Sequence, residues 1–317
     1  MLKKIKRKIL ISIAVAGLIY LGFTIYADYN QVAYAFRMFN WMLFPLLLVL
    51  SLINYMIRFL KWDYYLKILS VDLKRIDSLS IFMSGLIMSV TPGKMGELLK
   101  AYLVKEVNGT PISKTAPIVF VERITDFVSL LFIALTGAYL YDYGREIVLA
   151  VAIFFLVVLI VLSNKKIALP IIGLFERIKF LRKHLLNIHT AYESSYQMLK
   201  PVPLINMTVL SLFSWAFECL GYYLILLNFN LSVDIMWASF SYCFGTIVGA
   251  VSLLPGGLGV TEGSLTFMLV QKGATADIAV ASTFIVRVVT LWFAVLVGVI
   301  SVSFYQKRFG KINIEQV

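Results

Sequence analysis

The 317-residue sequence is poor in charged residues, and this scarcity excludes an ordinary soluble domain. Asp, Glu, Lys and Arg make up 15% of the residues, whereas soluble domains average about 25%. Hydrophobic residues make up 60%, and the mean hydropathy is +0.87. We therefore predict an integral membrane protein, in which lipid covers the apolar surface.

Cysteine and histidine are also scarce, which argues against a metal centre. The two cysteines, Cys219 and Cys243, lie in apolar sequence, and the two histidines, His184 and His189, have no cysteine beside them. A structural zinc site usually needs about four such ligands. The sequence predicts two buried thiols, no metal site and no cofactor.

Long apolar runs are abundant, and they predict an all-α integral membrane protein that forms one polytopic helical bundle. A membrane-spanning helix needs about 20 predominantly apolar residues. Runs near this length cover residues 9–27, 41–57, 115–140, 147–163, 204–227 and 274–304. No A-x-A cleavage site follows the first run, so we interpret it as an uncleaved signal-anchor.

The net charge of +12 is unevenly placed along the chain. Basic residues gather at the amino end and within 58–75, 94–114, 165–200 and 307–311, whereas the opposite loops, 28–40, 141–146 and 228–234, carry only Arg37 and Arg145. Cytoplasmic loops are typically enriched in Lys and Arg. We expect a multi-pass protein of the cell membrane with both termini in the cytoplasm and anionic lipid at its cytoplasmic face. No basic, aromatic-interleaved face predicts nucleic-acid binding.

Two segments, 78–107 and 234–272, interrupt this pattern. Each contains an apolar arm, a Pro-Gly break and a second arm, with Pro92 at the first break and Pro255 and Gly256 at the second. Broken backbone at membrane depth is tolerated where protein or a water-filled cavity satisfies the freed polar groups. We predict two re-entrant hairpins that turn at these residues, and full two-pass hairpins or simple loops stay open as alternatives.

The two breaks are followed by an arginine at nearly the same distance. Pro92 lies 31 residues before Arg123, and Pro255 lies 32 residues before Arg287. Three predicted crossings separate the breaks, so the second break faces the membrane from the opposite side. The sequence therefore predicts two inverted repeats, an arrangement that many transporters use around a midplane site.

Residues 171–199 form a further cytoplasmic stretch. Apolar residues recur there at three-or-four spacing, from Leu174 to Ile188, with basic residues such as Arg177 and Lys183 between them. This pattern predicts an amphipathic helix on anionic headgroups. A helix packed on the bundle is an equal alternative.

A helix that begins at membrane depth presents unpaired N–H groups and about half a positive charge, which attract an anion. The predicted substrate-binding residues are Gly93, Lys94, Gly96 and Glu97 at the first turn, Gly257, Gly259, Thr261 and Glu262 at the second, and Arg123 and Arg287. The two glutamates have three open roles, because a carboxylate there can cap the helix, carry a coupling proton or contact an ammonium group.

Ionisable residues inside the predicted spans give a second signal. They are Glu122, Arg123, Asp126, Glu218 and Arg287. Each would cost about 2.5–3.5 kcal/mol at a helix centre facing lipid, so we expect all of them to face inward. We expect Arg123 and Arg287 to grip an anionic headgroup and the carboxylates to form a supporting charge network, with Glu218 and Arg287 finding partners across the repeats. A purely structural ion-pair network is the alternative.

Four motifs carry a resemblance to a known family. They are TPGKMGELLKAYLV, VERITD, WAFECLGYYLILL, and LPGGLGVTEGSL followed by IVRVVTLWF. In this order they resemble the transmembrane-region family of lysylphosphatidylglycerol synthases, whose membrane part is a lipid flippase domain. The resemblance implies movement of lysylated phosphatidylglycerol, or of other lipid-linked carriers, from the inner to the outer leaflet. Full synthases continue into a soluble aminoacyl-transferase domain, and we expect none here.

Three function classes remain from the sequence alone. The first is a lipid flippase whose partner is a membrane phospholipid or a lipid-linked substrate. The second is an intramembrane enzyme, although H-E-x-x-H and G-x-S-x-G motifs are absent from the sequence. The third is an accessory subunit of a separate synthase, and a homo-oligomer is a further partner to consider. We expect a transporter rather than an enzyme.

Overall fold

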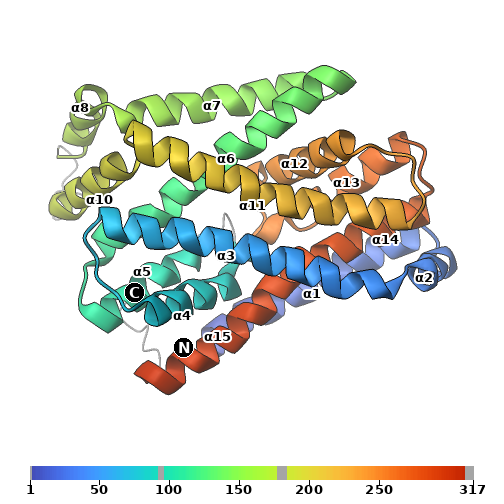
Figure 1. The fold of residues 1–317 in the computed structure, drawn as a ribbon, viewed down its shortest axis with the longest axis horizontal. Helices are drawn as coiled ribbons and strands as arrows, with labels where there is room; N and C mark the ends of the chain where they lie inside the picture. Colours follow the sequence, from blue (N-terminus) through green and yellow to red (C-terminus); the bar gives the residue numbers. More distant parts are fainter. Residues whose placement is uncertain (1, 92–95, 177–183, 311–317) are drawn as a thin grey trace.

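A computed structural model describes residues 2–91, 96–176 and 184–310, with side chains given from Ala14 to Gly173 and from His184 to Gly310 within these ranges (Figure 1). Every regular element in them is a helix, which confirms the predicted all-helical class. Pro92, Gly93 and Lys94 of the first predicted turn lie outside the described residues, as do residues 177–183 of the predicted amphipathic stretch.

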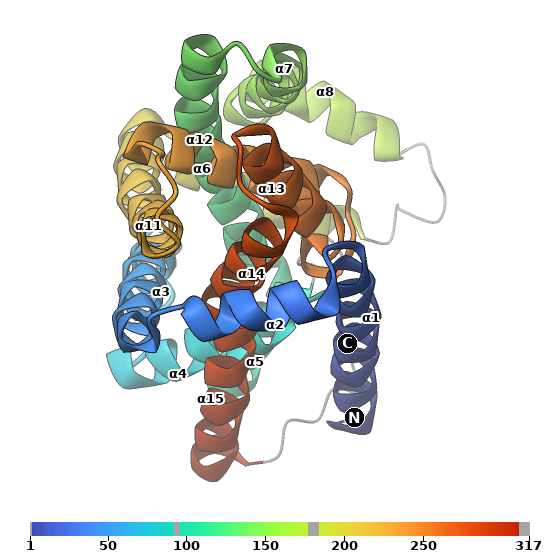
Figure 2. The ribbon, with the colours of Figure 1, turned by 90° about the vertical axis from the view of Figure 1, so that its right-hand side faces the viewer.

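The amino-terminal half contains three long helices and a broken hairpin between the last two. Its elements are α1 (Leu2–Tyr26), α2 (Tyr29–Met38), η1 (Trp41–Leu43), α3 (Phe44–Ile68), α4 (Arg75–Gly85), η2 (Leu86–Met88), α5 (Leu99–Asn108) and α6 (Ile112–Tyr141). The three long helices are α1, α3 and α6. Pro45 lies in the first turn of α3, where its missing N–H costs no intrahelical bond. Figure 2 shows α2 crossing the end of the bundle between α1 and α3.

The rest of the chain begins with helices that cover one side and then repeats the long-helix and hairpin order. Its elements are α7 (Arg145–Ser163), α8 (Lys165–Glu176), α10 (Leu185–Met198), α11 (Pro201–Asn228), α12 (Ile235–Val251), η4 (Pro255–Gly257), α13 (Val260–Gln271), α14 (Ala276–Arg287), the π-helix η5 (Val288–Trp292) and α15 (Phe293–Phe309). The last three form one continuous rod.

Helices α3 and α11 end in the same turn. Ser70 and Asn230 both take a left-handed conformation, with φ of 50° and 55°. The next residue donates its N–H to the carbonyl five positions back, over 2.9 Å after α3 and 3.1 Å after α11. The left-handed residue itself also donates its N–H, to the carbonyl three positions back. These two bonds at the end of each helix form a Schellman motif. The turn sends the chain back as α4 in one half and as α12 in the other.

The two hairpins enter the bundle from opposite ends. Helices α3 and α11 lie side by side and run in opposite directions (Figure 1), and Asn54 of α3 donates its amide to the Ser214 carbonyl and hydroxyl of α11 at 2.9 and 2.8 Å. The α4–α5 hairpin therefore enters from the end where α3 finishes, and the α12–α13 hairpin enters from the other end.

Four helices of the described chain are long and apolar enough to cross a membrane. They are Trp41–Ile68, Arg145–Ser163, Pro201–Asn228 and Ala276–Phe309, and they coincide with four of the six predicted spans. The other two predicted spans lie in α1 and α6, which are not in this set. These apolar helices indicate a membrane protein, and the count of six crossings stays a prediction.

The predicted stretch 171–199 contains two separate described helices. Helix α8 ends at Glu176 and α10 begins at Leu185. Helix α10 packs against α6, and its end at Met198 and Leu199 is buried in the core. Helix α10 therefore agrees with the second prediction for this stretch, a helix that packs on the bundle.

Candidate functional site

The two broken segments meet inside the bundle. A side chain added at Gly256 would place its Cβ 3.6 Å from the Val90 Cα and 3.1 Å from the Leu291 Cδ2. Val90 and Leu291 belong to one buried apolar cluster that also contains Leu258. The rod α14–α15 holds the first hairpin as well, because Gly298 packs directly on the backbone of Ile87. The residues that lead into the first turn thus touch the second turn.

The second turn needs its glycines. Gly256, Gly257 and Gly259 have φ of 60°, 66° and 85°, values that a residue with a Cβ adopts only with strain. Helix α13 begins directly afterwards, as the sequence predicts for a fresh helix start. Its start is occupied by the protein itself, because the Gly259 N–H donates to Glu262 Oε2 at 2.7 Å. Of the three roles open to Glu262, capping is the one seen here.

Arg287 ties this turn to α14. Its Nε lies 2.6 Å from Glu262 Oε1, and its Nη2 donates to the Gly256 carbonyl. Glu262 is 0% exposed and Arg287 is 8% exposed. Tyr20 of α1 donates to Glu262 at 3.4 Å and accepts from the Trp292 indole at 3.0 Å. The result is a cluster around one buried ion pair, with the partly buried Tyr20 and Trp292 at its edge and Thr261 buried beside it.

The first half contains the corresponding ion pair. Arg123 Nη2 lies 2.5 Å from Glu97 Oε2, and the two residues are 26 positions apart, against 25 for Glu262 and Arg287. At the turn itself, the Gly96 N–H donates to the Thr91 hydroxyl at 2.9 Å. Each arginine therefore pairs with the glutamate that follows the turn of its own half. The expectation that Arg287 pairs across the repeats is wrong, because a partner in its own half lies closer.

The first ion pair is part of a larger network. Lys100 binds Glu122 at 2.7 Å and approaches Glu97 at 3.6 Å. Asp126 accepts from Lys61 at 2.7 Å and, across the bundle, from Ser211 of α11 at 3.0 Å. All five charged groups are at most 5% exposed, so the structure turns Glu122 and Asp126 inward.

Two guanidinium groups converge on one oxygen of this network. Arg58 Nη2 lies 3.1 Å and Arg123 Nη1 lies 3.6 Å from Asp126 Oδ2. Their side chains are 15% and 18% exposed, more than any other member. Counting Arg58, Lys61, Lys100 and Arg123 against Glu97, Glu122 and Asp126 gives four positive groups and three negative ones. These seven groups carry an excess of one positive charge, which Glu218 of α11 balances through its electrostatic interaction with Arg58. The least buried part of the network is the pair of arginines.

The sequence interpretation missed Arg58, Lys61 and Lys100. It placed the first two in a basic loop after a span ending at residue 57, whereas α3 continues to Ile68. A usable signal was present, because Ser51, Asn54, Arg58 and Lys61 recur every three or four residues and form one polar helix face. In the structure all four make contacts inside the bundle.

Glu218 lies at the position that corresponds to Arg58. Each is 12 residues before the left-handed residue of its helix, Asn230 or Ser70. Glu218 accepts a hydrogen bond from the Tyr242 hydroxyl at 2.7 Å, and it is close enough to Arg58 to interact with it electrostatically. The two halves thus share one backbone plan but place opposite charges at this point.

Cys219 and Cys243 are buried free thiols in the structure, with their sulfur atoms 3.7 Å apart. In the part of the chain that the structure describes, no three His, Cys, Asp or Glu side chains form a group that would hold a metal ion.

Comparison with known proteins identifies the family of this chain. Residues 9–298 match a family described as lysylphosphatidylglycerol synthase TM region. A UPF0104 membrane protein of Methanocaldococcus jannaschii is 31% identical over 234 residues, which cover 70% of this chain and 95% of the relative. A UPF0104 membrane protein of Methanothermobacter thermautotrophicus is 24% identical over 312 residues, which cover 92% of each chain.

Proposed function

Because the chain belongs to the lysylphosphatidylglycerol synthase transmembrane-region family, we propose that it is a lipid flippase of the cell membrane. It moves an anionic or aminoacylated phospholipid, or a lipid-linked carrier, between the two leaflets. Both termini lie in the cytoplasm, as the placement of Lys and Arg favours. The lipid leaves chemically unchanged, so the protein acts as a transporter and not as an enzyme.

The lengths of the hairpin arms support re-entrant hairpins. Helices α4, α5 and α13 contain 11, 10 and 12 residues, which is about 15–18 Å at 1.5 Å per residue, and α12 contains 17 residues, which is about 26 Å. The hydrocarbon core is about 30 Å thick, so the three short arms reach only about halfway and α12 also falls short of crossing. Entry from opposite ends of the bundle and the matched Glu–Arg separations support inverted repeats, and the approach of Val90 to the second turn agrees with a site near the midplane.

The observation that carries the proposal is the pair of partly exposed arginines on one carboxylate oxygen. A guanidinium group can bind phosphate through two parallel N–H bonds. Here Arg58 donates one hydrogen bond to Asp126 and Arg123 lies 3.6 Å from the same oxygen, so a phosphate in this place would lie within reach of both groups. Asp126 is thus an internal substitute for the headgroup when the site is empty. Arrival of a phosphate lets the arginines exchange one anion for another, which avoids leaving a charge unpaired inside the membrane.

The second half has a different task in this proposal. Its pair, Arg287 and Glu262, is more deeply buried and closes on the turn backbone. It fixes the start of α13 and gives the first half a rigid surface to move against. Transport is then a change in how the first hairpin and α6 pack on the second hairpin, with the phosphate held by Arg58 and Arg123.

The test is transfer of labelled lipid in vesicles that contain the purified protein. Arg58→Lys and Arg123→Lys keep the charge but lose the planar pair of donors, and we expect each to slow transfer of labelled phosphatidylglycerol by about tenfold or more, the equivalent of one lost charge-assisted bond. Arg145→Lys is the matched control, because Arg145 is 39% exposed and pairs with Asp142 in the loop before α7.

Equal transfer by wild type, both Lys variants and protein-free vesicles would refute the proposal. Mass spectrometry of the recovered lipid decides between transport and chemistry, since a covalent change in the headgroup would favour an intramembrane enzyme.

A further inference from the structure

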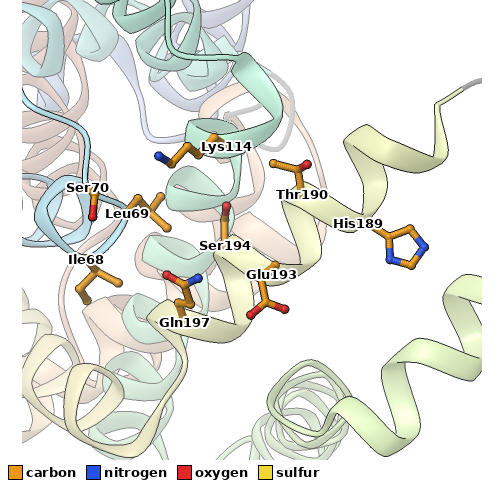
Figure 3. A pocket seen from close by; sticks show the side chains of 9 residues that line it. All are labelled: Ile68, Leu69, Ser70, Lys114, His189, Thr190, Glu193, Ser194 and Gln197. Atoms are coloured by element: carbon orange, nitrogen blue, oxygen red, sulfur yellow. The ribbon is translucent and has the colours of Figure 1, made fainter.

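A polar cavity lies away from the paired arginines, Arg58 and Arg123. It has a volume of about 510 Å³ and opens between the turn after α3, the first turn of α6 and one face of α10 (Figure 3). It is lined by Ile68, Leu69, Ser70, Lys114, His189, Thr190, Glu193, Ser194 and Gln197. Lys114 lies nine residues before Arg123 on the same helix, or about 14 Å along its axis.

Lys114 brings an unbalanced positive charge to this cavity. Its side chain is half-buried, and no ion pair found among the described residues includes it. Lys114 lies in the first turn of α6. The N-cap residue of this helix is Pro111, which gives no side-chain cap. The N–H groups of Ile112 and Ser113 have no intrahelical acceptor there. The uncapped helix start and the lysine both favour an anion.

Ser194 is an independent sign of a ligand. It is 5% exposed, and within the described ranges its hydroxyl makes no hydrogen bond. Figure 3 shows the hydroxyl of Ser194 pointing from α10 toward α6, on the same side as Lys114. The Ser194 side chain lines the cavity, where its hydroxyl can form a hydrogen bond with a ligand.

The one carboxylate of the cavity does not oppose an anion, because it already has a cation. Both oxygens of Glu193 accept from Lys165 of α8, at 2.9 and 2.8 Å. Hydrogen bonding to Glu193 raises the pKa of Lys165, so Lys165 keeps its charge at neutral pH. His189 is exposed, and its ring points away from the other lining side chains in Figure 3.

We propose that this cavity binds the phosphate of an anionic phospholipid in the adjacent leaflet, at a site separate from the transport path. A lipid is the source of the phosphate because the cavity lies at the end of α3, a helix long and apolar enough to span the membrane, and headgroups surround such an end. Beside it, α10 exposes 81% of Leu186, an apolar surface for an acyl chain. A lipid bound here joins α10 to the ends of α3 and α6.

The test uses the full chain in detergent with Arg123→Gln as the background, so that the proposed transport site is disabled. The thermal unfolding midpoint is followed while dioctanoyl phosphatidylglycerol, dioctanoyl phosphatidylcholine or inorganic phosphate is added. We expect phosphatidylglycerol to raise the midpoint at the lowest concentration. Lys114→Gln should raise the concentration needed by about tenfold or more, and Ser194→Ala by a few-fold, since each removes one hydrogen bond to the phosphate.

Lys105→Gln is the matched control, because it removes an exposed lysine at the end of α5 outside the cavity, and it should titrate like the background protein. Identical titrations for Lys114→Gln and Lys105→Gln would overturn the site. An equal response to phosphatidylcholine would refute the preference for an anionic headgroup. An equal response to inorganic phosphate would refute a lipid as the source of the phosphate. Should Lys114→Gln fail to fold, photo-crosslinking of a diazirine-bearing phosphatidylglycerol to the unaltered chain decides, with labels expected on α10 and a lack of labels there refuting the proposal.

Discussion

Glu262→Gln removes one charge from the buried ion pair of the second half while keeping the shape of the side chain. The amide oxygen of glutamine can still accept from the Gly259 N–H, so most of the cap of α13 is preserved. Arg287 then keeps its charge at 8% exposure without a carboxylate. Removing one partner of a buried pair typically costs about 3–5 kcal/mol, and we expect a loss near 3 kcal/mol in the free energy of unfolding.

A double-mutant cycle separates the pair from the cap. Arg287→Met alone leaves a buried carboxylate, whereas Glu262→Gln with Arg287→Met leaves no charge. We expect the double variant to be less destabilised than the sum of the single variants by about 2 kcal/mol or more. The measurement is reversible denaturation in mixed micelles. Additivity within about 0.5 kcal/mol would refute the reasoning, because it would mean that the two side chains do not depend on each other.

The same cycle on Glu97 and Arg123 gives the comparison. Arg123 is 18% exposed and also approaches Asp126 at 3.6 Å, so its charge keeps a second partner and some water when Glu97 is replaced. We expect a coupling of about 1 kcal/mol or less. A large coupling in the second half and a small one in the first would agree with a rigid half and a mobile half.

Three further predictions concern the fold. Asp234→Ala should lower the free energy of unfolding by about 1 kcal/mol, because the carboxylate caps α12 by accepting from the Trp237 N–H at 2.9 Å. This bond lowers the Asp234 pKa. Denaturation curves should therefore show its contribution to stability above the ordinary pKa near 4 and its loss as the pH falls and the carboxylate protonates. Gly298→Ala should lower the unfolding temperature, since its Cβ would overlap the Ile87 backbone, whereas Gly17→Ala, with open space around it, should be neutral or stabilising. Cys219 and Cys243, at 3% and 0% exposure, should react with a maleimide only after denaturant is added, and rapid labelling of the native protein would contradict their burial.

Sequence reasoning reached the parts of the site that depend on local pattern. The glycine-rich turn before Glu262 and the matched spacing to Arg287 are visible in the chain, because left-handed backbone and a helix start each need particular residues. The pairing of the arginines was not predictable in the same way. Spacing along a sequence says which face of a helix a residue occupies, and the partner depends on how separate helices pack.

The missed arginine illustrates a second limit. Arg58 follows an apolar run, and a rule based on hydrophobic length ends the span before it. The structure extends α3 by 11 residues past position 57, because polar side chains that bond to α6 and α11 can stay inside a bundle. A helix boundary drawn from hydropathy alone is therefore too early where polar side chains continue the helix inside the bundle.

The charge reversal between Arg58 and Glu218 limits how this molecule can be assembled. Two copies of the amino-terminal half, joined in the manner of a symmetric homodimer, would bring two guanidinium groups to the place where an arginine and a glutamate now lie within electrostatic range of each other. Like charges brought close together inside the bundle repel each other. The two halves therefore differ in charge at this position, and a chain assembled from two copies of the amino-terminal half should be less stable than this one.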